Sequence, residues 1–296
     1  MMLACMPLLW ADKTIPQAGL WALLLLSTSV GFIHGALDAV LLPQRFASRT
    51  QAALMFVGYL LSVLLLGWLL GGAVSLALWV LLLMSAWHFG EPYGRWNGFS
   101  LLQSGLTRIV VGGASVMLPV LLAPEQLANI VIRVLPALGY QGWQVLAWSW
   151  LGFFVIWLVL GGVRRARELR YAWFELLGCV LLYALFSPLM AFALYFGVYH
   201  APVHIWRVWR ASANAALAGS PKIATGGAIA AAALTTILTW LLGAGLWWFL
   251  APDAFAAPDG SAALRWLIVA FAALTAPHLV LISLCAAFLT QPDTDR

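Results

Sequence analysis

Long apolar stretches separated by short polar segments fill most of the chain. A helix needs about 20 apolar residues to cross the hydrocarbon core of a bilayer, and nine stretches approach or exceed that length. They are residues 17–37, 52–71, 73–89, 104–123, 143–162, 172–187, 189–206, 224–250 and 264–289. The pattern predicts an all-α, polytopic transmembrane helical bundle of about eight or nine spans. It also predicts a single integral membrane domain over residues 1–296.

The breaks between some stretches leave the span count open. Only Gly71-Gly72 separates the second stretch from the third, and only Ser187-Pro188 separates the sixth from the seventh. Each pair is therefore either a tight hairpin or one bent element. The segment 124–140 carries charges and a proline, which fits a short helix at the membrane interface.

Composition and charge agree with a membrane location. Hydrophobic residues make up 64% of the chain and charged residues only 8%, whereas a soluble domain carries about 25% charged residues. With nine spans, twelve of the fifteen Lys and Arg fall on one side of the membrane, which the positive-inside rule makes cytoplasmic. This bias explains the net charge of +5 without a nucleic-acid partner. We expect a multi-pass protein of the cytoplasmic (inner) membrane, with the N-terminus outside and the C-terminus inside.

Four of the five histidines fall near the predicted cytoplasmic ends of spans. His34 is on the first span, His88 on the third, and His200 and His204 on the seventh. Ionisable residues inside a membrane are costly and usually functional, and a spacing of four puts His200 and His204 on one helix face. Hydrogen bonding between helices explains a single histidine equally well. Four at one depth favour a metal site, because imidazole binds zinc, copper, iron and nickel; axial ligation of haem is the alternative.

Two carboxylates follow these histidines closely. Asp38 follows His34 by four residues and Glu91 follows His88 by three, so each lies one turn beyond its histidine if the helix continues. Metal-binding histidines usually donate their other ring N–H to a carboxylate or carbonyl. We expect Asp38 and Glu91 to hold the rings in this way; the alternative is a solvated charge at the membrane interface.

Three more residues are candidates for supporting the ligands or lining a substrate pocket. Tyr199 and Trp87 adjoin His200 and His88 and suit contact with an apolar, conjugated ligand, although ordinary packing explains them equally well. His278 lies near the middle of the last span, roughly 16 Å of helix from its cytoplasmic end. We therefore expect it to line the pocket or hydrogen-bond a ligand-bearing helix rather than bind the metal.

The histidine-bearing segments resemble a known family. GFIHGALDAVLLP, SAWHFGE, YFGVYHAPVHIWR and APHLVL occur in this order, and they are similar in order and spacing to the Brp/Blh family of microbial membrane-bound β-carotene dioxygenases. The resemblance covers roughly residues 20–290. It implies an enzyme that cleaves β-carotene at the central 15,15′ double bond, using Fe²⁺ and O₂, to give two molecules of all-trans retinal. The family's iron ligands fall on His34, His88, His200 and His204.

The resemblance also implies partners. β-Carotene dissolves only in the lipid bilayer, so a site among the spans, toward the cytoplasmic half, can take it directly from lipid. Retinal would return to lipid or pass to an opsin. Two alternatives remain: a non-enzymatic membrane protein that binds haem or a metal, and an oxygenase or isomerase acting on another isoprenoid.

Overall fold

Helices make up every element in the part of the chain that the computed structural model describes. That part comprises residues 17–37, 48–93, 100–134, 137–162, 169–217 and 261–284, with isolated positions between 230 and 245. Within these ranges there is no strand, which confirms the predicted all-α class. The chain divides into two compact units. Unit 1 combines residues 1–27 with 79–199, and unit 2 combines residues 28–78 with 200–296.

The helices follow the predicted stretches closely. In chain order they are α1 (Gln17–Ala36), α3 (Arg49–Gly71), α4 (Val74–Phe89), η2 (Glu91–Tyr93), α5 (Leu101–Leu122), α6 (Pro124–Val134), α7 (Ala137–Trp157), η3 (Leu158–Gly162), α8 (Arg170–Leu185), α9 (Pro188–Leu194), η4 (Tyr195–His200), α10 (Ala201–Leu217) and α12 (Ser261–Leu284). Gly72 ends α3 before α4 begins, and extended backbone at Ser187 separates α8 from α9. Both pairs are therefore two helices each. Most of the predicted span 224–250 lies outside the described residues.

Five helices in the described ranges are long and apolar enough to cross a bilayer. They cover Thr50–Gly71, Val74–Tyr93, Leu101–Leu122, Tyr140–Gly161 and Arg265–Ser283. Large apolar side chains lie on the outside of several of them, as at Leu54 and Leu61 of α3 and Val145 of α7. Such surfaces are stable in lipid and costly in water, so the five helices indicate a membrane protein.

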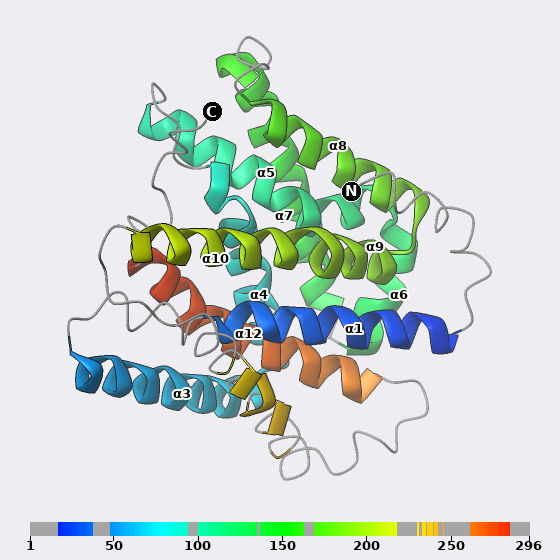
Figure 1. Cartoon of the computed structure of the whole chain (residues 1–296). Helices are drawn as coiled ribbons and strands as arrows, with labels where there is room; N and C mark the ends of the chain where they lie inside the picture. The colour runs from blue at the N-terminus through cyan, green and yellow to red at the C-terminus, as the bar shows by residue number, and fades with distance from the viewer. Residues whose placement is uncertain are drawn as a thin grey trace. The chain divides into compact units, whose positions relative to one another are not determined.

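Unit 1 is built around α5, whose residues from Val110 to Val120 are buried. The helices α7 and α8 pack along it (Figure 1). Indole and phenol groups donate to α5 where they are buried: Trp150 Nε1 donates to the carbonyl of Val110 over 3.0 Å, and Tyr183 Oη to that of Ser115 over 2.6 Å. Buried donors need such partners because no water is present to replace them.

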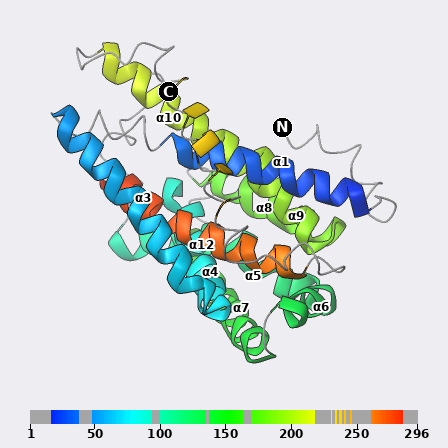
Figure 2. The same cartoon turned by 90° about the horizontal axis from the view of Figure 1, so that it is seen from below.

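Unit 2 contains α3 packed along α12, as the view from below shows (Figure 2). Glycines lie in this interface. A Cβ atom at Gly67 would meet Ala273 at 3.9 Å, and one at Gly71 would meet the Trp266 ring at 3.4 Å. Small residues allow helices to approach closely in membranes, where dispersion contacts replace the hydrophobic effect as the driving force.

The helix that carries His200 and His204 is longer and less regular than predicted. The prediction ended it at residue 206, but α10 continues to Leu217. Hydropathy marked where the apolar stretch ends, and the helix runs on through more polar residues. Its middle part, η4, is a π-helix. Single turns of π-helix are uncommon and occur frequently at functional sites.

Candidate metal centre

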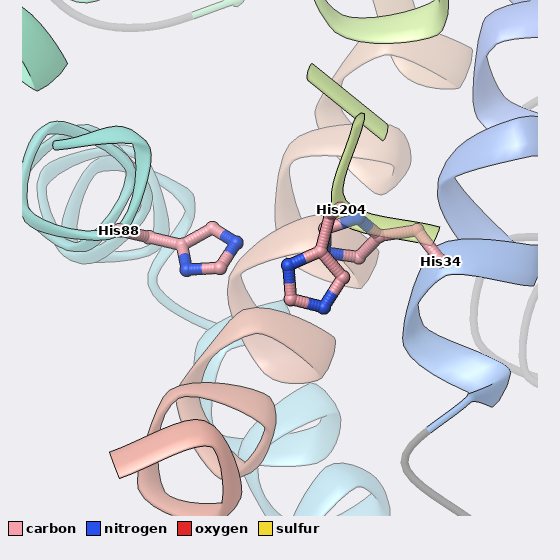
Figure 3. Close-up of side chains that lie close together, drawn as sticks. All are labelled: His34, His88 and His204. Atoms are coloured by element: carbon pink, nitrogen blue, oxygen red, sulfur yellow. The ribbon is translucent and has the colours of Figure 1, made fainter. Parts of the chain in front are cut away.

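Four buried histidine rings lie together in unit 2. They come from α1 (His34), the last residue of η4 (His200), α10 (His204) and α12 (His278), and each is at most 8% exposed. The His34 ring is central: its centroid lies 4.1 Å from that of His204, 4.8 Å from that of His278 and 5.4 Å from that of His200. Figure 3 shows His34 and His204 close together. Both members of the His200/His204 pair thus reach His34, as their spacing suggested.

The contact between His34 and His278 is the closest of the group. The two Nε2 atoms lie 3.1 Å apart, and the rings of His204 and His278 are 5.5 Å apart between centroids. This separation fits a hydrogen bond between two imidazoles. It also fits a shared ion, because two nitrogens at about 2.1 Å from one metal and at right angles are about 3.0 Å apart. A set of buried imidazole nitrogens therefore suits a transition metal.

His278 lies nearer the other histidines than its sequence position suggested. The sequence placed it deep in the last span and away from the cytoplasmic ends. In the structure its ring contacts His34 of α1, and Pro277 precedes it within α12. The position of His278 along α12 did not predict its distance from His34, because that distance depends on how α12 and α1 cross.

A small-residue contact fixes α1 against the helix that carries His200. Ser27 Oγ donates to the carbonyl of Ala193 over 2.9 Å. A Cβ atom at Gly197, within η4, would lie 2.5 Å from the same Oγ. Ser27 precedes His34 by seven residues, which is about two helical turns and the same face of α1. The glycine and the serine therefore set the distance at which α1 approaches η4.

His88 belongs to unit 1, at the end of α4, and is 4% exposed; Figure 3 draws it as well. Backbone contact with α5 holds this end of α4. A Cβ atom at Gly112 would lie 2.1 Å from the carbonyl oxygen of Ala86, and one at Gly90 would lie 1.9 Å from that of Arg108. Only glycine fits at Gly90 and Gly112. These two glycines allow the backbones of α4 and α5 to touch on both sides of His88.

Besides His278, the residues that the sequence predicted to support the metal ligands or to line the pocket are Glu91, Asp38, Trp87 and Tyr199. Because α4 ends at Phe89, Glu91 lies in the 3₁₀ turn η2 and not on a further α-helical turn after His88; Asp38 lies outside the described residues. Trp87 is 46% exposed, with the Arg108 guanidinium 3.8 Å from its ring. The hydroxyl of Tyr199 donates to Glu175 over 3.0 Å.

Glu175 is a buried charged residue of unit 1 that the sequence analysis did not single out. It lies on α8, is 6% exposed, and accepts hydrogen bonds from three tyrosines. A signal was present, because this carboxylate interrupts the apolar segment YAWFELLGCV. Ionisable residues inside a membrane are usually functional, so this carboxylate is identifiable as a candidate from the sequence alone.

Comparisons with known proteins agree with these features. The family model described as "Beta-carotene 15,15'-dioxygenase" matches residues 25–286. A curated protein of that name from an uncultured marine bacterium, 66A03, is 31% identical over 290 residues, which cover 93% of this chain and 96% of the relative. No solved structure matches the chain.

Proposed function

The chain belongs to the β-carotene 15,15′-dioxygenase family, and on this premise we propose that it cleaves β-carotene at its central double bond with O₂. Each carbon of the broken bond takes one oxygen atom, so the products are two molecules of all-trans retinal. The observation that carries the proposal is the group of four buried imidazoles in unit 2, centred on His34. Buried ionisable groups are costly in a membrane and imidazoles suit a transition metal, so this group supports a metal site.

We propose that the metal is Fe²⁺, held by His34, His88, His200 and His204. Bound ferrous iron supplies the centre at which O₂ is activated. Four neutral imidazoles would add no negative charge to the ion. His278 hydrogen-bonds His34 in this proposal and fixes the orientation of its ring, as partners of metal-binding histidines commonly do.

The proposal also covers the membrane topology and the route of substrate and product. The protein forms one membrane domain of eight or nine spans in the inner membrane, with the metal toward the cytoplasmic half. The twelve-to-three distribution of Lys and Arg supports this orientation. β-Carotene enters from the lipid, and retinal returns to lipid or passes to an opsin.

Expression in a carotenoid-accumulating bacterium tests the function. Pigment extracts should contain all-trans retinal and less β-carotene, and a variant with both His200 and His204 replaced by alanine should leave β-carotene intact. Longer aldehydes in place of retinal would move the cleavage to another bond. A Soret band in the purified protein, with no change in the pigments, would instead favour a haem protein.

A further inference from the structure

One buried carboxylate in unit 1 accepts three phenolic hydroxyls. Tyr195 Oη donates to Glu175 Oε1 over 2.6 Å, while Tyr93 Oη and Tyr199 Oη donate to Oε2 over 2.5 Å and 3.0 Å. The two hydroxyls that share Oε2 are 3.5 Å apart. We call these four residues the Glu175 cluster. An ionised carboxylate only accepts hydrogen bonds, and three hydroxyl donors match that requirement.

Burying the Glu175 carboxylate lowers the stability of the fold, and the packing of α8 does not need a carboxylate at this position. Glu175 lies on a helix that is otherwise apolar from Tyr171 to Leu185, and a buried charge or polar group is unfavourable unless it is hydrogen-bonded. A leucine would fill a similar volume at that position without the cost. The residues that the carboxylate holds must therefore explain its presence.

The three tyrosines lie close in sequence to two of the proposed metal ligands, His88 and His200. Tyr93 is in η2, five residues after His88. Tyr195 and Tyr199 are in the π-helix η4, five residues and one residue before His200. Through Glu175, α8 therefore joins η2, the turn that follows α4, to η4.

Aromatic contacts connect the same two segments directly. Phe89, the neighbour of His88, packs edge-on against Tyr195 with ring centroids 5.4 Å apart, and its ring lies 6.3 Å from that of Phe196. Edge-to-face pairs of this kind are favourable and depend on orientation. Hydrogen bonds to Glu175 hold the tyrosine in the orientation that this contact needs.

We propose that Glu175 is a positioning residue of the metal centre. It fixes the end of α4 and the π-helix η4 relative to one another, and thereby sets where His88 and His200 point. In this proposal it acts through the tyrosines and the backbone that carries them. This role rests on the metal site of the proposed function. The tyrosines then hold the backbone that carries the metal ligands and do not line the carotenoid pocket.

The test removes single hydroxyls and measures metal binding without turnover. The variants are Tyr93→Phe, Tyr195→Phe and Tyr199→Phe, each made in the full chain and purified metal-free in detergent. Tyr183→Phe is the matched control: it removes a buried hydroxyl from α8 itself, one that donates to Ser115 and not to Glu175. Titration with Co²⁺ gives the affinity, the visible absorption of bound Co²⁺ reports its coordination geometry, and thermal unfolding reports stability.

We expect the Tyr93 and Tyr195 variants to bind Co²⁺ about 10–100-fold more weakly than wild type, with altered absorption bands, which is the range for residues that support metal ligands. Tyr183→Phe should lower the melting temperature by a similar amount but leave affinity and absorption unchanged. Glu175→Gln keeps one acceptor oxygen, so it should lose less affinity than Glu175→Leu. If Glu175→Leu does not fold, the tyrosine variants still decide the question.

Three results would each overturn either the positioning role or the metal centre. Wild-type affinity and absorption in all three tyrosine variants would refute the positioning role and leave the metal centre standing. An equal loss in Tyr183→Phe would show that the effect is general destabilisation, and would refute it too. A wild-type protein that binds no Co²⁺ would instead overturn the proposed metal centre.

Discussion

Gly112→Ala is the substitution that most directly tests whether backbone packing around His88 matters for activity. Gly112 lies on α5 opposite the end of α4. A Cβ atom added there would lie 2.1 Å from the carbonyl oxygen of Ala86 and 2.3 Å from the amide nitrogen of Gly90. These two residues flank His88 on either side. Both obstacles are backbone atoms, so no side chain can rotate away to make room.

The size of the disturbance follows from these distances. Contacts of a Cβ atom below 3.0 Å are essentially never seen, so the distance to the Ala86 oxygen must grow from 2.1 Å to at least 3.0 Å and displace α4 from α5 by about 0.9 Å. Overpacking of this kind costs about 1–3 kcal/mol of folding stability. A displacement of about 1 Å at a catalytic site can cost roughly a hundredfold in rate. We therefore expect a folded protein that forms retinal about a hundredfold more slowly.

Gly105→Ala is the matched control. It lies on the same helix, seven residues earlier, and a Cβ atom there has nothing within 4 Å. Replacing a helical glycine by alanine is stabilising by about 0.5–1 kcal/mol when space allows, so this variant should be fully active and no less stable. The assay is retinal formed per folded protein, with metal content and melting temperature measured alongside. Equal activity of Gly112→Ala and Gly105→Ala would refute the reasoning.

Three further outcomes are expected. His204→Ala should abolish retinal formation and metal binding, whereas His278→Ala should lower activity by only about 10–100-fold; loss of both in His278→Ala, with both retained in His204→Ala, would exchange the roles of these residues. Chelation should leave a protein that still binds β-carotene but does not cleave it, and Fe²⁺ should restore cleavage; full activity in rigorously iron-free protein would contradict the mechanism. A reporter fused to the C-terminus should be active on the cytoplasmic side, and activity only outside would reverse the topology.

Much of the helical organisation could be predicted because it depends on local pattern. Apolar length alone located α3, α5 and α7, since the bilayer sets a minimum length for a span. The spacing of His200 and His204 indicated two rings on one side, and both rings lie against His34.

The remaining features depend on contacts between segments distant in sequence, which periodicity does not report. The approach of His278 to His34 joins residues 244 positions apart, and the hydrogen bond from Tyr93 to Glu175 joins residues 82 positions apart. The π-helix η4 has no pattern in a single sequence that separates it from an α-helix. Hydropathy also ended α10 too early, because a helix continues after its apolar face has ended.

Small residues in close backbone contact hold the histidine-bearing helices against their neighbours. Ser27 and Gly197 set the approach of α1 to η4, as Gly90 and Gly112 set that of α4 to α5. Lipid tails are as apolar as the side chains, so burial provides little force to hold helices in register within a membrane. Close backbone contact and buried hydrogen bonds must do so instead. The positions of the ligands should therefore be as sensitive to one added methyl group at these contacts as to changes beside the metal, although none of these small residues carries a metal-binding group.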